Sequence, residues 1–137
     1  MARDPLAVLA RLRQIETEAA RRRLGQAVGR AEVALLAEAS ARGALVAEAS
    51  APGPDYGAWL PRGLAQRDRA ALARRRAEAG LAEAAAALGE ARAAERAVEL
   101  LAATQARLAR RQAARRAQAQ LDEAAARRHG AAPSPSD

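Results

Sequence analysis

The feature that most constrains this chain is a proline- and glycine-rich interruption between two long stretches of helix-forming sequence. Residues 50–63 hold three of the six prolines, three of the nine glycines, and the only Tyr and Trp. Proline lacks the amide hydrogen that a helix needs, and glycine costs conformational entropy within a helix. The sequence therefore predicts one helix over about residues 5–49, a bend over 50–63, and a second helix over about 64–128.

Alanine dominates the apolar side chains on both sides of the interruption. The chain has 44 Ala against 16 Leu, five Val and one Ile, and it has no Phe. Because burial energy scales with apolar area, these side chains cannot fill a globular core, but they suffice for one seam between two helices. Abundant Ala, Glu, Leu and Arg are typical of coiled coils. We therefore predict an all-α fold, a long antiparallel two-helix coiled-coil hairpin, as a single domain over residues 1–130 with a disordered tail at 131–137.

Apolar residues recur at intervals of three or four along both predicted helices, as expected for a coiled-coil seam. The expected seam reads Leu9, Leu12, Ile15 and Ala19 on the first helix, and Ala94, Val98, Leu101, Gln105 and Leu108 on the second. The unequal lengths imply that the second helix overhangs the first, or that it breaks at Gly80 or Gly89. We expect Tyr56 and Trp59 to pack over the bend; the alternative is that they form an exposed contact for a partner.

The charge of the chain is strongly basic, at +7, and all 23 basic residues are Arg. The excess of positive charge suggests an acidic partner. The coding bias of a GC-rich genome would also give abundant Ala and Arg with no Lys. In the predicted hairpin, arginines from the two ends of the chain meet: Arg11, Arg13 and Arg21–Arg23 lie near Arg107, Arg110, Arg111, Arg115 and Arg116. Such an end is either solvated or binds an acidic partner.

Several classes of chemistry lack the residues they need. The chain has no Cys, and its one His, His129, stands alone beside the C-terminal stretch. No metal-binding, nucleotide-binding or nucleophile motif occurs, so we expect a non-enzymatic protein without cofactor, metal or small-molecule ligand. No apolar run approaches the roughly 20 residues of a membrane span. Asp4 and Pro5 stand where a signal peptide needs apolar residues, which predicts a cytoplasmic protein.

Residues 115–128, with the sequence RRAQAQLDEAAARR, resemble the closing segment of the FliJ/YscO family. These are small coiled-coil proteins of the flagellar and virulence type III export apparatus. The family commonly ends its second helix with a basic, glutamine-rich run and a Leu/Met-Asp-Glu triplet, here residues 121–123. The aromatic residue that often follows is replaced by Ala124. Residues 5–9 and 16–21 are similar to the family's first helix, and the family also has an aromatic residue near the bend.

The resemblance implies a set of partners. Family members form an antiparallel two-helix coiled coil, similar to the stalk of rotary ATPases, and engage the hexameric export ATPase with the end that bears both termini. They also contact the export-gate membrane protein and the chaperones of late export substrates, at the cytoplasmic face of the inner membrane. The partner-binding residues implied here are Arg110, Arg111, Arg115, Arg116, Asp122 and Glu123, with Tyr56 and Trp59 as a secondary contact.

Two other functions are compatible with the same residues. A basic coiled coil associated with nucleic acid would use its clustered Arg side chains to neutralise phosphates. Against this, the predicted helices lack the aromatic side chains on which bases stack. A generic scaffold, in which two unbent chains pair as a dimeric coiled coil, is the third reading.

Overall fold

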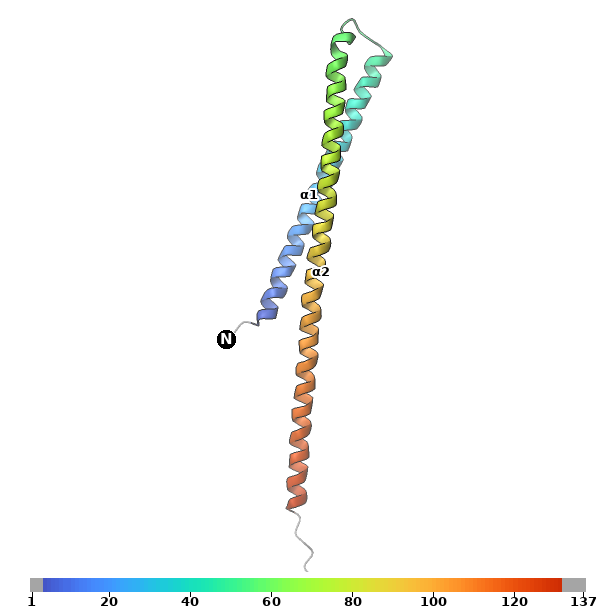
Figure 1. Cartoon of the computed structure of the whole chain (residues 1–137). Helices are drawn as coiled ribbons and strands as arrows, with labels where there is room; N and C mark the ends of the chain where they lie inside the picture. Colours follow the sequence, from blue (N-terminus) through green and yellow to red (C-terminus); the bar gives the residue numbers. More distant parts are fainter. Residues whose placement is uncertain (1–3, 132–137) are drawn as a thin grey trace, which may run out of the picture. The chain divides into compact units, whose positions relative to one another are not determined.

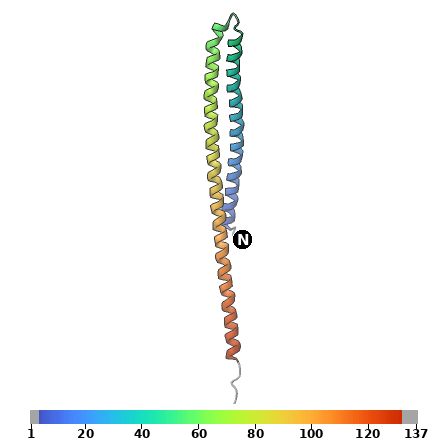
Figure 2. The same ribbon diagram turned by 90° about the vertical axis from the view of Figure 1, so that its right-hand side faces the viewer.

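The computed structural model describes residues 4–131 as two helices joined by a short bend (Figure 1). Helix α1 spans Pro5–Ser50 and helix α2 spans Tyr56–Gly130, with no strand among the described residues. Up to residue 95 the helices lie side by side and antiparallel, as Figures 1 and 2 both show. The fold is the predicted all-α helical hairpin. Of the predicted tail, Ala131 forms a turn and residues 132–137 lie outside the described residues.

Contacts divide the chain into two units, residues 1–95 and residues 96–137. The first unit contains α1, the bend and the first part of α2, and the second contains the remainder of α2. Helix α2 has 75 residues against 46 in α1, and it is continuous through Gly80 and Gly89. A break at either glycine, which was one explanation for the unequal lengths, is therefore not found.

Helix α1 begins where a capping residue precedes a proline. Asp4 is the N-cap, and its Oδ1 accepts a hydrogen bond from the backbone N–H of Leu6 at 3.0 Å. Pro5 occupies the first helical position. A backbone N–H at that position has no intrahelical acceptor, so the absence of this N–H in proline costs the helix no hydrogen bond. The helix starts at the residue pair that the sequence indicates.

The bend is shorter than predicted. It covers residues 51–55, and α2 begins at Tyr56 rather than near residue 64. The backbone N–H groups of Ala58 and Trp59 both donate to the carbonyl of Asp55, which closes the first turn of α2 ahead of Pro61. Pro61 thus lies inside the helix, where it removes one backbone hydrogen bond without ending it. The two prolines in the bend itself, Pro52 and Pro54, are enough to reverse the chain.

The two aromatic residues pack on each other at the start of α2. The rings of Tyr56 and Trp59 are stacked, with their centroids 6.2 Å apart and their planes at 27°. Trp59 also covers Gly63, one helical turn later, so closely that a Cβ at residue 63 would lie 2.8 Å from Cη2 of Trp59. Both rings are half-buried, and the glycine beneath the indole is buried. The aromatic pair therefore packs on itself and on the first turns of α2, and its expected packing over the bend stays a prediction.

Small side chains form most of the contact between the helices. Within the first unit the buried apolar residues are Ala20, Ala27, Ala41 and Leu88, and Thr17 is the most buried residue. Alanine at a helix contact allows the backbones to approach closely, because no bulky side chain separates them. The seam is consequently narrow and contains few large apolar groups.

The predicted seam is wrong for several of its large side chains. Leu12 and Ile15 of α1 are 48% and 49% exposed, and Leu101 and Leu108 of α2 are 46% and 51% exposed. Thirteen of the chain's 22 Leu, Val and Ile side chains are exposed. Within the hairpin, the buried positions of α1 are Thr17, Ala20 and Ala27, which lie on a different side of the helix from Leu12 and Ile15.

One buried ion pair joins the two helices. Glu38 of α1 is 4% exposed, and its carboxylate pairs with Nε of Arg74 on α2. Arg42, one turn further along α1, approaches the same carboxylate at 2.8 Å, and Arg74 also binds Glu78 at 2.7 Å. A buried charge is tolerated only where an opposite charge is held beside it. This group of four residues favours one alignment of α1 along α2, because sliding either helix would separate Glu38 from Arg74.

We expect the replacement of glycines by alanine to have opposite effects at two positions. A Cβ at Gly29 of α1 meets nothing within 4 Å. The variant Gly29→Ala should raise the free energy of unfolding by about 0.5–1 kcal/mol, since alanine is the better helix former. Gly63→Ala should lower it, because the added methyl group displaces the indole of Trp59. Urea denaturation followed by circular dichroism measures the free energy of unfolding of both variants. A lower free energy of unfolding for Gly29→Ala than for the wild-type protein would contradict the expectation.

We also expect the buried carboxylate to be essential for hairpin stability. Glu38→Ala should lower the free energy of unfolding by about 1–3 kcal/mol, because it removes the carboxylate that joins α1 to Arg74 and leaves Arg74 paired only with Glu78 of its own helix. Glu32→Ala is the matched control, since Glu32 is exposed on the same helix and takes part in no ion pair among residues 4–131. A double-mutant cycle with Arg74→Met measures the coupling. If Glu38→Ala and Glu32→Ala lowered the free energy of unfolding equally, the ion pair of Glu38 would have no special role in hairpin stability.

Candidate partner-binding surface

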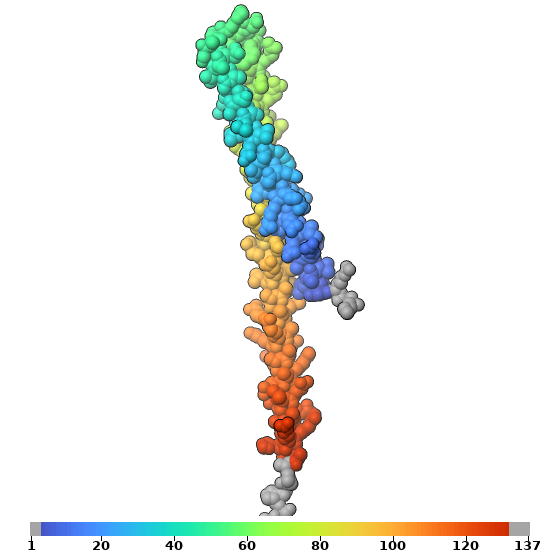
Figure 3. Space-filling view, turned by 180° about the vertical axis from the view of Figure 1, so that it is seen from behind, coloured from blue at the N-terminus to red at the C-terminus, as the bar shows by residue number. Residues whose placement is uncertain are grey.

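All six of the predicted partner-binding residues lie on the later part of α2. Every residue from 103 to 131 is exposed. Seen from behind in Figure 3, the side chains of this orange-to-red segment stand out separately around the helix. The segment carries seven Arg and only two acidic residues, Asp122 and Glu123. We call residues 103–130 the basic segment.

The arginines of the basic segment do not share one face. With 3.6 residues per turn, Arg111, Arg115 and Asp122 lie along one side of the helix. Arg116 and Glu123 lie along a second side, and Arg110 on a third. The basic segment therefore presents arginine on several sides of the helix and not on one face, which suits a site that surrounds a helix better than a groove on one side of it.

The two acidic residues of the basic segment are occupied by neighbours on the same helix. Oδ1 of Asp122 accepts a hydrogen bond from Gln118 at 2.8 Å, and Glu123 forms an ion pair with Arg127. Within residues 4–131, none of Arg110, Arg111, Arg115 and Arg116 takes part in an ion pair. The positive charge of these four side chains is available for an acidic partner.

A row of alanines follows the same helix. Ala102, Ala106, Ala109, Ala113 and Ala117 recur at intervals of three or four residues, which continues the spacing of Leu88, Ala91, Glu95 and Val98. From Ala106 onward these alanines are exposed. The sequence analysis overlooked them because it followed the larger side chains. The basic segment thus combines arginines with a small-residue face of the kind that packs against a helix in the hairpin.

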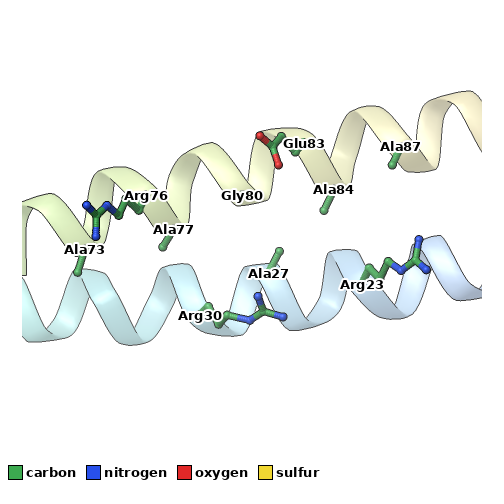
Figure 4. A pocket seen from close by; sticks show the side chains of 10 residues that line it. All are labelled: Arg23, Ala27, Arg30, Ala73, Arg76, Ala77, Gly80, Glu83, Ala84 and Ala87. Carbon is green, nitrogen blue, oxygen red and sulfur yellow. The ribbon is translucent and has the colours of Figure 1, made fainter.

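One arginine of the other group, Arg23, lies against the first part of α2. Arg23 of α1 lines a groove of about 680 Å³ together with Glu83, Ala84 and Ala87 of α2. Figure 4 shows the alanine side chains of both helices directed into this groove, with Arg30 and Arg76 beside them. In the hairpin Arg23 is therefore a neighbour of residues 83–87. The expected grouping of Arg21–Arg23 with Arg107–Arg116 joins residues of the two units, and it stays a prediction.

The part of the chain that the structure describes offers few other candidate sites. It contains no group of three or more His, Asp or Glu side chains that could hold a metal ion. His129 is exposed in the last turn of α2, beside Arg127 and Arg128. None of the described helices is both long enough and apolar enough to cross a membrane. The basic segment is therefore the leading candidate for a functional surface.

Comparison of the chain with protein-family models, with curated proteins and with solved structures found no significant match.

Proposed function

We propose that this protein is a non-enzymatic component of a type III protein export apparatus, of the FliJ/YscO kind. In this proposal the basic segment enters the ring of the hexameric export ATPase, as the stalk of a rotary ATPase enters its ring. The protein also contacts the export gate and the chaperones of late substrates, at the cytoplasmic face of the inner membrane. The basis is the resemblance of residues 115–128 to the closing segment of that family.

The observation that carries the proposal is the distribution of charge on the basic segment. Its residues are all exposed, and its arginines occupy several sides of one helix. A helix that binds in a one-sided groove needs complementary charge on one face only. A helix enclosed by a ring meets partner groups on more than one side, so arginine on several sides of the helix supports a site of the second kind.

The hairpin stabilises the first part of the helix that carries this segment. Isolated alanine-rich helices are marginal in water unless they are long or packed against a partner, and the seam supplies that packing up to residue 95. Helix α2 then runs without a break to Gly130. A continuous helix can transmit torque or position from one partner to another, which is what a stalk-like component requires.

The proposal predicts that arginines of the basic segment are needed for ATPase binding. Addition of the protein to the hexameric export ATPase of the same organism should raise the rate of ATP hydrolysis. The double variant Arg110→Glu/Arg111→Glu should weaken binding by at least about tenfold, because each reversal replaces an attraction by a repulsion. The matched control is Arg75→Glu/Arg76→Glu, which changes the net charge equally on an exposed part of the same helix within the hairpin.

The outcomes separate the proposal from its alternatives. The proposal would be overturned if the wild-type protein neither bound the export ATPase nor stimulated its ATP hydrolysis. Equal losses of binding affinity for the two double variants would also overturn it. A protein that shifts nucleic acid at physiological salt, with affinity falling steeply as salt rises, would favour the nucleic-acid reading instead.

A further prediction concerns the aromatic pair beside the bend. Trp59→Ala should lower the free energy of unfolding by about 1–2 kcal/mol, because the half-buried indole covers Gly63 and stacks on Tyr56. Binding to the export ATPase should change less than about twofold, since the basic segment is unaltered. Chemical denaturation and an ATPase titration measure the two effects. Lost binding with unchanged stability would place the functional surface at the bend.

A further inference from the structure

A stripe of large aliphatic side chains on α1 is not used by the hairpin. Val8, Leu12, Ile15 and Ala19 follow one another at intervals of three or four residues, so they lie on one side of the helix. Val8, Leu12 and Ile15 are 54%, 48% and 49% exposed. The seam uses a different side of α1, through Thr17, Ala20 and Ala27. We call these four residues the α1 stripe.

A row of charged residues runs beside the α1 stripe. Asp4, Arg11, Glu18 and Arg22 are separated by seven, seven and four residues, so they also share one side of the helix. All four are exposed, and none takes part in an ion pair within residues 4–131. Along the row the signs alternate: acidic, basic, acidic, basic. Read from the opposite end, the same row is basic, acidic, basic, acidic.

We propose that the α1 stripe is a self-association surface, on which α1 of a second copy of this chain packs in antiparallel orientation. In this pairing Leu12 of each copy lies against Ile15 of the other, and Val8 lies against Ala19. The charged row is then complementary to itself, because Arg11 meets Glu18 of the second copy and Asp4 meets Arg22. A twofold symmetric contact of this kind buries the same surface on both copies and closes without further growth.

Charge favours a second copy as the occupant of this surface. A partner helix of uniform acidity would match Arg11 and Arg22 but would repel Asp4 and Glu18, whereas the reversed row matches all four. Charge complementarity also excludes self-pairing through the basic segment, because that segment contains seven Arg and only two acidic residues. Self-association is therefore confined to α1, and the basic segment keeps its exposed arginines.

The apolar part of the contact is tested by one substitution on the full-length chain. Ile15→Glu places a charge in the centre of the α1 stripe and should weaken dimerisation by more than about tenfold, because the charge is desolvated in the dimer. Leu36→Glu is the matched control, since Leu36 is 69% exposed on α1 outside the stripe. Sedimentation equilibrium over a concentration series measures the dimer fraction, and circular dichroism checks that both variants remain helical.

The charged row allows a sharper test that depends on orientation. Arg11→Glu and Glu18→Arg should each weaken the homodimer by about fivefold, because each creates two like-charge contacts across the symmetric interface. The double variant Arg11→Glu/Glu18→Arg should recover wild-type dimerisation. An equimolar mixture of the two single variants should form a heterodimer in preference to either homodimer, because every charge in the mixed pair again meets its opposite.

Each outcome decides the proposal. A wild-type chain that stays monomeric up to about 1 mM would overturn it, as would equal dimerisation of Ile15→Glu and Leu36→Glu. A mixture of single variants that shows no preference for the heterodimer would overturn the antiparallel pairing. The experiment contains no export ATPase, so its result is independent of the proposed function.

Discussion

The structure depends on a helix contact made mostly of alanine. Each buried methyl group contributes little apolar area, so the stability of the hairpin comes from a long contact and not from a deep core. A seam of this kind is poorly specified, because alanines at one alignment resemble alanines at the next. The ion pair between Glu38 and Arg74 supplies the missing specificity, since a buried carboxylate is stable only where its partner is present. Alignment and stability are thus provided by different residues.

The alanine seam also determines which surfaces remain for other molecules. Because the hairpin does not bury them, Leu, Val and Ile side chains lie exposed along both helices, and a lone soluble monomer rarely exposes so many. On α1 the exposed groups are flanked by charges of alternating sign. On the later part of α2 they are accompanied by arginines on several sides. The two helices therefore present surfaces of different character, one self-complementary and one that requires an acidic partner.

Much of the fold follows from the sequence alone, and the remainder depends on three-dimensional packing. Prolines and glycines identify the reversal, and the Asp4-Pro5 pair identifies the start of α1. The seam was harder to predict, because heptad spacing directs attention to Leu12, Ile15, Leu101 and Leu108, whereas close backbone approach favours alanine. Pro61 also misled the prediction of where α2 begins, since a proline after the first turn removes a single hydrogen bond. The predicted site residues fall on an exposed helix, and Arg23 lines a groove within the first unit.

The separation of the two surfaces has a consequence for how such a protein can work. If one face of the chain had to bind both a second copy and an acidic partner, the two events would compete. Here the α1 stripe lies within the first unit and the basic segment within the second. Dimerisation through α1 would then use none of the residues of the basic segment, so the two binding events would draw on separate side chains.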